Sequence, residues 1–117
     1  MNSIRPNFPV GDLARAVAFY QRTLGFEVRV HSPEYGLAIL GLGHIELALL
    51  GGTPAGPASA YIEVVDVDTV FAACESDPDA TLLGPLTTKP WGLRDFGMTD
   101  PWANMLGIGE RVGERSD

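Results

Sequence analysis

The sequence predicts an α+β domain made of two βαβββ modules, whose strands curl into a mixed-sheet cup with the helices on its outer face. Three observations lead to this prediction. A helix-periodic stretch follows the first strand-like segment, three more strand-like segments follow that helix, and the same order starts again half-way along the 117 residues. A repeat of half the chain length indicates two related units in one compact domain, residues 1–117.

The first module is expected to span residues 1–50. Apolar residues recur at helical spacing from Leu13 to Leu24, which predicts an amphipathic helix. Asp12 stands at the N-cap position and Gly25 at the position where a left-handed residue ends a helix. Turn-forming proline and glycine separate the strands. The expected strands of this module are 3–10, 26–30, 36–40 and 44–50.

The second module is expected to span residues 58–110, after a flexible Gly- and Pro-rich connector at 51–57 and before a polar tail at 111–117. Its helix begins at Val67, and Cys74 falls on the apolar face of that helix, which predicts a buried thiol. The expected strands of this module are 59–65, 80–83, 93–99 and 104–110.

Composition excludes several functional classes. The 8 basic and 15 acidic residues give a net charge of −7, whereas a nucleic-acid-binding protein needs a basic surface. One cysteine allows neither an intrachain disulfide nor a cysteine-built zinc site. The sequence contains no apolar run of about 18 residues and no signal-peptide pattern. We therefore expect a cytoplasmic protein that binds neither nucleic acid nor membrane.

Alternation along the strands predicts which side chains share a face. Ile45, Leu47 and Leu49 form an apolar set that should pack beneath the helices. Polar and small residues then collect on the opposite face in four of the strands. That face is either ordinary solvent-exposed surface or the lining of a concave site, and the composition is compatible with both.

Several motifs resemble the vicinal oxygen chelate superfamily, which includes glyoxalase I, extradiol dioxygenases, fosfomycin-resistance enzymes and bleomycin resistance proteins, the last being the most similar. The motifs are Val10-Gly-Asp-Leu-Ala-Arg-Ala-Val-Ala-Phe-Tyr20, Thr23-Leu-Gly-Phe26, Gly43-His-Ile-Glu-Leu47, Ser59-Ala-Tyr-Ile-Glu-Val64 and Gly92-Leu-Arg-Asp-Phe96, followed by Asp100-Pro101 and Asn104. The resemblance implies the two-module cup and a homodimer. It leaves open whether modules pair within one chain or are exchanged between two.

The resemblance also implies where a catalytic metal would be held. The superfamily's four ligands correspond to Arg5, Glu46, Ser59 and Gly107. Glu46 alone among them is a good ligand, because arginine is cationic and glycine has no side chain, while a catalytic ion needs about three protein ligands. We therefore expect no metal and no cofactor, and an ion pair between Arg5 and Glu46 within about 4 Å.

Seven residues are candidates for ligand binding. Acidic residues on the cup would attract a cation, unless they are solvated or paired with Arg5 and Arg94. The sequence leaves open which side chains of residues 91–99 face the cup. We expect exposed tryptophans in the long loop and at the last hairpin tip. We expect His44 to be a half-exposed residue beside a turn and not a general base. The resemblance adds Tyr35, which lies near a loop where bleomycin resistance proteins have an aromatic residue that contacts the ligand. The seven are Tyr35, Glu46, Tyr61, Glu63, Trp91, Asp95 and Trp102.

These residues support two main hypotheses. The first is a metal-free protein of the bleomycin resistance type that sequesters a cationic or planar aromatic compound, an antibiotic being one candidate, in a dimer groove without chemistry. The second is a glyoxalase- or dioxygenase-like lyase or oxidoreductase acting on a small oxygenated substrate. A dimeric domain without a dedicated ligand is a third. Metal content and ligand-induced stabilisation distinguish them.

Overall fold

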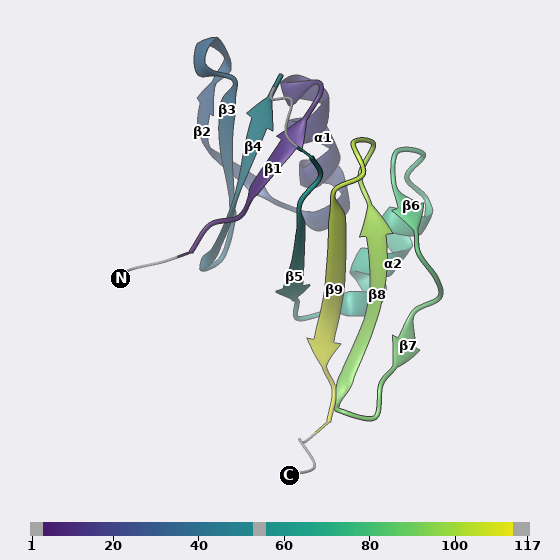
Figure 1. Ribbon diagram of the computed structural model, residues 1–117. Helices are drawn as coiled ribbons and strands as arrows, with labels where there is room; N and C mark the ends of the chain where they lie inside the picture. The colour runs from purple at the N-terminus through teal and green to yellow at the C-terminus, as the bar shows by residue number, and fades with distance from the viewer. Residues whose placement is uncertain (1–3, 53–55, 114–117) are drawn as a thin grey trace.

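The computed structural model describes residues 4–52 and 56–113, which form two mixed sheets and two α-helices (Figure 1). The first sheet has the strand order β1-β4-β3-β2, with β1 parallel to β4 and the other pairs antiparallel. The order of its elements along the chain, strand, helix and three strands, matches the predicted first βαβββ module. Its strands are β1 (Asn7–Val10), β2 (Glu27–Ser32), β3 (Leu37–Leu42) and β4 (Ile45–Gly51).

The second sheet repeats this topology, so the predicted internal repeat is confirmed. β5 runs parallel to β9, β9 pairs antiparallel with β8, and both β6 and β7 pair with β8. The short strand β7 was not predicted from the sequence. The strands of this sheet are β5 (Ser59–Glu63), β6 (Thr81–Leu82), β7 (Thr87–Thr88), β8 (Leu93–Thr99) and β9 (Met105–Arg111).

Each helix begins after an aspartate that caps its first turn, and Asp12 is the cap predicted for the first helix. In α1 (Leu13–Leu24), the Asp12 carboxylate accepts a hydrogen bond from the Arg15 amide, and Gly25 ends the helix with φ of 76°. In α2 (Val67–Glu75), Asp66 caps the first turn in the same way. These contacts satisfy amides that have no partner inside a helix. A short 3₁₀ turn, η1 (Pro33–Tyr35), fills the predicted break between β2 and β3.

Strand boundaries differ from the predictions by a few residues. β1 starts at Asn7, because Pro6 has no amide hydrogen to donate to a ladder and contributes only its carbonyl, which accepts from Ala48. β5 ends at Glu63, two residues earlier than expected. Arg111 belongs to β9 and not to the polar tail. Residues 53–55 of the connector and 114–117 of the tail lie outside the described residues.

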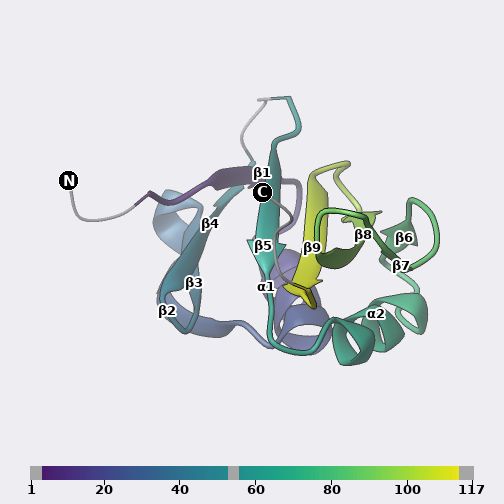
Figure 2. The same cartoon turned by 90° about the horizontal axis from the view of Figure 1, so that it is seen from below.

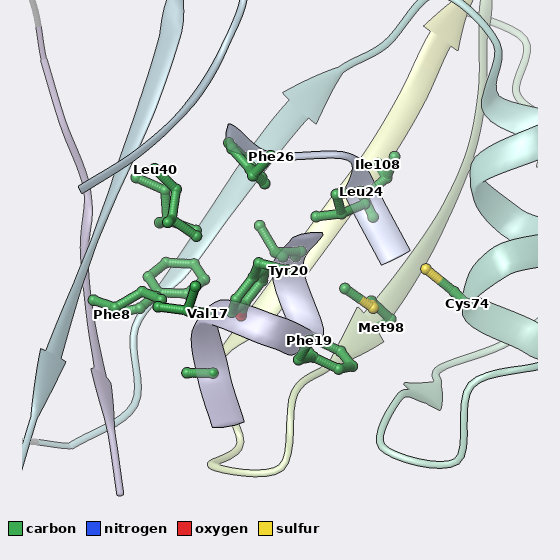
Figure 3. Packing of buried hydrophobic residues seen from close by; sticks show 14 of the residues in the cluster. Phe8, Val17, Phe19, Tyr20, Leu24, Phe26, Leu40, Cys74, Met98 and Ile108 are labelled. Carbon is green, nitrogen blue, oxygen red and sulfur yellow. The ribbon is translucent and has the colours of Figure 1, made fainter. Parts of the chain in front are cut away.

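Helix α1 packs against both sheets and joins the two modules in one core (Figure 3). Phe8 and Leu40 of the first sheet lie on one side of the helix, and Met98 and Ile108 of the second sheet lie on the other (Figure 3). Both helices lie on the same side of the sheets (Figure 2). The opposite faces of the sheets, which we call the concave faces, are therefore left uncovered by helices.

A buried polar network ties the last hairpin to the first module. The Asp100 carboxylate accepts hydrogen bonds from the Tyr20 hydroxyl at 2.7 Å and from the backbone amides of Trp102 and Asn104 at 2.9 Å. The Asn104 side chain donates to Asp100 and to the carbonyl of Pro9 in β1, and it accepts from Ala58. Burial, followed by the nearby Asp100 charge, raises the pKa of Tyr20. The hydroxyl therefore stays protonated and keeps donating.

Trp102 corrects one expectation from the sequence. It was predicted to stand exposed at the hairpin tip, but it is half-buried against the core, with its Nε1 where a side chain on Gly11 would lie. The Arg15 guanidinium lies 5.6 Å from the centre of its ring, a cation–π contact. The hairpin folds back over the junction between β1 and α1, which gives Trp102 a packing role.

Two further expectations from the sequence concern the burial of the cysteine and membrane-spanning segments. Cys74 is fully buried as predicted, and burial raises the pKa of its thiol to about 11. Over the described residues, neither helix has the length and hydropathy that a bilayer crossing requires.

The network predicts the effect of Tyr20→Phe. This substitution removes one of the donors to a carboxylate that is only 3% exposed, so the free energy of unfolding should fall by about 1–3 kcal/mol. Urea denaturation followed by circular dichroism measures the change. The matched control is Tyr35→Phe, which alters a hydroxyl on an exposed side chain and should leave stability unchanged. Equal stability of the two variants would contradict a structural role for the network.

Candidate functional site

An ion-pair cluster occupies the concave face of the first sheet. Arg5 Nη1 lies 3.2 Å from Glu46 Oε1, and Arg29 Nη1 lies 3.1 Å from Glu46 Oε2. The predicted pair between Arg5 and Glu46 is confirmed. The hydrogen bonds from Arg29 and then from Arg5 lower the pKa of the Glu46 carboxyl, so it stays ionised between the two guanidinium groups.

Arg29 reaches Glu46 by crossing the neighbouring strand. The β2–β3 register shifts between Val28 and Val30, and the Arg29 side chain lies directly over Gly41 of β3. A side chain at Gly41 would collide with this guanidinium. The second guanidinium nitrogen donates to the Gly43 carbonyl at 2.8 Å. The bulge and the glycine therefore fix Arg29 flat on the sheet.

An aromatic ring occupies the equivalent face of the second sheet. The Tyr61 ring of β5 lies over Gly107 and Gly109 of β9, so a side chain at Gly107 would come within 2.6 Å of Tyr61 Cδ2. Its hydroxyl donates to Asp95 Oδ2 at 2.9 Å, and Lys89 Nζ lies 2.7 Å from Asp95 Oδ1. Partial burial, and then the hydrogen bond to Asp95, raise the pKa of Tyr61 to about 12. The phenol is therefore neutral, its ring rests on the two glycines, and its hydroxyl is bound to Asp95.

A pocket of about 350 Å³ opens between the two modules beside Tyr61. One wall comes from the first module, the other comes from β5, and most of the lining is apolar. This volume is at the small end of the range for ligand sites. The lining residues are Ile4, Pro6, Phe26, His44, Ile45, Glu46, Leu47, Ala60, Tyr61, Ile62 and Glu63.

A larger pocket of about 590 Å³ adjoins the first on the helix side of β5. Both pockets are lined by His44, Ile45 and Glu63, so the turn between β3 and β4 separates them. Ile45 was expected to pack beneath the helices, but it is 37% exposed. It starts β4 at the gap between the modules, where no helix covers it.

The acidic residues expected to face the cup are all paired. Glu46 is held by two arginines, Glu63 lies 2.8 Å from Arg111 Nη2, and Asp95 lies beside Lys89. Arg94, the alternative partner suggested by the sequence, pairs instead with Asp68 on the helix side. Four cations thus pair with these three carboxylates on the concave faces, and Glu27, opposite Gly41 in the β2–β3 register, adds a fourth carboxylate, so this surface carries no acidic excess.

Comparison with known proteins places the chain in a family. A sequence model of the Glyoxalase/Bleomycin resistance protein/Dioxygenase superfamily matches residues 3–108. The chain belongs to this superfamily. Its curated relatives include the bleomycin resistance protein of Geobacillus stearothermophilus, which is 26% identical over 130 residues covering 92% of this chain and 95% of the relative.

Solved structures have the same fold at low sequence identity. TioX from Micromonospora sp. ML1 is 24% identical, with a TM-score of 0.82 over 96% of this chain and 100% of the other. A bleomycin-binding protein complexed with bleomycin is 20% identical, with a TM-score of 0.71 over 94% and 98% of the two chains. At these identities the structural likeness establishes the fold alone.

The superfamily's metal centre does not fit these residues. Glu46 is occupied by two cationic guanidinium groups, and Arg5 repels a divalent ion. In the second module Ser59 lies opposite Met105, whereas Gly107 lies opposite Tyr61. The register therefore sets Met105, two residues before the expected Gly107, at the place equivalent to Glu46. Neither residue supplies an oxygen or nitrogen side-chain ligand, so these positions lack the donors that a catalytic metal needs.

A separate group of carboxylates, not singled out as a metal site from the sequence, lies at the start of α2. Asp66, Asp68 and Glu110 have oxygen atoms within 4.8 Å of one another. Each carboxylate already has a partner: Asp66 caps α2, Asp68 pairs with Arg94, and Glu110 accepts from the Val67 amide. These contacts give the three carboxylates a structural role at the first turn of α2.

The seven candidate residues fall into two groups in the structure. Glu46, Tyr61 and Glu63 line the same pocket, and Asp95 holds the Tyr61 hydroxyl. The remaining three do not line either of the two pockets. Tyr35 is exposed in η1, Trp91 is exposed in the turn before β8, and Trp102 packs over the junction of β1 and α1.

Sequence reasoning missed two residues that organise the site, Arg29 and Lys89. Arg29 lay in an expected strand without a role, and a glycine on the adjacent strand was the one signal that a long side chain lies across it. Lys89 precedes Asp95 by six residues in the β7–β8 hairpin. That hairpin was not predicted, so no sequence pattern indicated that Lys89 pairs with Asp95.

The Glu46 carboxyl should titrate below its ordinary pKa of about 4.3. Its contribution to folding is present above the ordinary pKa and is lost as the pH falls through the lower value of the folded protein. Carbon NMR of the carboxyl group against pH measures the midpoint. Arg29→Gln should raise it more than Arg5→Gln, because the Arg29 hydrogen bond is the larger cause.

Arg15→Gln is the control for this titration, because Arg15 pairs with Asp79 on the helix side. It should leave the Glu46 midpoint unchanged. A wild-type midpoint at or above the ordinary value would show that the ion-pair cluster is not formed in solution.

Proposed function

We propose that the protein is a metal-free binding protein that sequesters a planar aromatic small molecule on the Tyr61 ring without a chemical step. The observation that carries this proposal is the fixed position of that ring. Tyr61 is 48% exposed, so one face rests on the glycines of β9 and the other is open to a ligand.

A ring that is already immobile is a favourable stacking surface. Aromatic pairs gain about 0.5–1.5 kcal/mol beyond the area they bury. Ordering a free side chain on binding costs a similar amount. Tyr61 is already ordered in the folded protein by its contacts with Gly107, Gly109 and Asp95, so binding does not have to order it. Lys89 holds Asp95 in turn.

The neighbouring surfaces support a planar ligand. The pocket of about 350 Å³ beside Tyr61 has apolar walls from Pro6, Ile45 and Ile62, together with the polar groups of His44, Glu46 and Glu63. A compound with one or two rings suits this volume. The adjoining pocket of about 590 Å³ gives a longer ligand room to extend past the β3–β4 turn.

The curated relatives support a binding function. Bleomycin resistance proteins are similar to this chain over nearly its whole length. We therefore propose that the bound compound is an antibiotic or a similar natural product. The lyase or oxidoreductase alternative draws no support from the chain, because the positions that would hold the metal carry Arg5, Ser59 and a residue without an oxygen or nitrogen donor.

We further propose that the protein is a homodimer. β1 and β5 end their sheets on the sides that border the pocket, and within the described residues neither has a second strand partner. Ile4 and Val65, both strongly exposed, lie at this gap. A second copy would bury these side chains and close the groove, either by docking on it or by exchanging modules.

A thermal-shift panel of aromatic compounds, bleomycin included, tests the binding function. A ligand present at 100 times its dissociation constant should stabilise the protein by about 2.7 kcal/mol. Tyr61→Ala should weaken binding at least tenfold, because the stacking surface is lost. Tyr35→Ala is the matched control and should bind as the wild type does, since that exposed ring lies outside the pocket.

Two results would contradict the binding proposal. One is the absence of any stabilisation across the panel. The other is a stoichiometric transition metal in the protein after mild purification, since a held metal would return the chain to the enzymatic alternative.

The dimer should have twice the 12.5 kDa mass of one chain in light scattering. Mixing two inactive variants, Tyr61→Ala in the second module and Ile45→Trp in the first, then separates the two arrangements. If modules pair across chains, half of the grooves in a mixed dimer combine two intact modules and bind ligand. If modules pair within one chain, no groove is intact. A monomeric mass would refute the dimer.

A further inference from the structure

Cations are concentrated on the concave faces of a protein that is acidic as a whole. The net charge is −7, yet the ion pairs on these faces involve four cations and three carboxylates: Arg5, Arg29, Lys89 and Arg111 with Glu46, Glu63 and Asp95. The other described arginines pair with aspartates on the helix side. With Glu27, which lies opposite Gly41 on the same face, four cations accompany four carboxylates, so the concave faces do not share the acidic excess of the whole protein.

At Glu46, two guanidinium groups share one carboxylate. Each makes a single contact, at 3.2 Å from Arg5 and 3.1 Å from Arg29, and not the two-point fork that arginine forms with a dedicated partner. Among the described residues, Arg5 donates no other hydrogen bond. Its remaining donors are available, and its side chain is 42% exposed.

The cluster borders the pocket that the stacking ring lines, and Arg5 and Arg29 are linked to the pocket lining through Glu46. Glu46 lines the pocket from the first module, and Tyr61 lines it from the second. The carboxylates on the Tyr61 side are already matched one to one, Glu63 with Arg111 and Asp95 with Lys89. A ligand cation would find no unmatched carboxylate there, whereas a ligand anion that reaches past Glu46 at the edge of the pocket would meet the two arginines that share this carboxylate.

We infer that the ligand carries an anionic group, and that its class is a planar aromatic acid with its ring on Tyr61 and its carboxylate on Arg5 and Arg29. This inference rests on the proposed binding function and replaces the cationic ligand suggested by the overall charge. Arginine suits the role because its planar donor fork matches a carboxylate. Glu46 acts as a placeholder that keeps both guanidinium groups in position before the ligand arrives.

Three compounds with the same ring system provide the test: 2-naphthoate, 2-naphthamide and 2-naphthylmethylammonium. Calorimetric titration should show naphthoate binding at least tenfold tighter than the amide, and the ammonium compound binding weakest. The naphthoate affinity should also fall as sodium chloride is raised, because salt screens exposed charges, while the amide affinity should not.

Variants of the cluster should act in opposite directions. Arg5→Gln should reduce naphthoate affinity about tenfold and leave the amide within twofold of wild type. Glu46→Gln should increase naphthoate affinity several-fold, because it removes the competing carboxylate and frees both guanidinium groups. A merely structural cluster would weaken binding in both variants and for both compounds. Arg15→Gln is the matched control on the helix side and should change neither affinity.

The outcomes separate this inference from the function on which it rests. If the ammonium compound or the amide binds as tightly as naphthoate, and Tyr61→Ala still abolishes binding, the anionic class is wrong and the aromatic binding site stands. If Arg5→Gln and Glu46→Gln shift naphthoate affinity in the same direction, the assigned role of the cluster is wrong. If none of the three compounds binds while a compound of the aromatic panel does, the inference fails and the proposed function stands; if nothing in the panel binds either, both fail.

Discussion

The arrangement of the two modules depends on one buried carboxylate, Asp100. Hydrogen bonds from Tyr20, from two backbone amides of its own hairpin and from Asn104 surround it, and Asn104 continues to β1 and to the start of β5. An ionised group inside a protein is tolerated only when such donors replace the water it has lost. The hairpin is therefore tied both to β1 and to the start of β5, one from each module.

Glycines on the inner strands leave room for a side chain to lie across the concave face of each sheet. Gly41 makes room for the Arg29 side chain in the first module, and Gly107 and Gly109 make room for the Tyr61 ring in the second. In both modules a side chain from a neighbouring strand lies across the backbone and ends at a carboxylate. The repeat seen in the sequence thus extends to the construction of the site, although one module carries a guanidinium and the other carries a phenol.

Local patterns predicted the elements of this fold well, because their causes are local. Helical periodicity and the caps at Asp12 and Gly25 fix α1 within a few consecutive residues. The partners of Trp102 are not local: Gly11 and Arg15 lie about ninety positions away in the chain, and no alternation pattern reports such a contact. The aromatic was therefore assigned to solvent when it belongs to the packing between modules.

The same limit explains why the charges of the site were only partly predicted. The pair between Arg5 and Glu46 followed from the resemblance to a family whose ligands lie side by side. The contact of Arg29 with Glu46 depends on a strand irregularity, and that of Lys89 with Asp95 depends on a hairpin whose first strand has only two residues. Charge counts along the sequence suggested an acidic cup, while the folded backbone brings a cation to each acid.

The glycine support of Tyr61 has a consequence for the kinetics of recognition. A ring that rests on backbone atoms and is tethered through its hydroxyl does not need to reorient when a partner arrives. Association then depends on diffusion and on entry past the β3–β4 turn, with no slow rearrangement of the contact surface. Related compounds would arrive at similar rates and differ mainly in how long they stay. Residence time, more than capture rate, would set which molecule this protein retains.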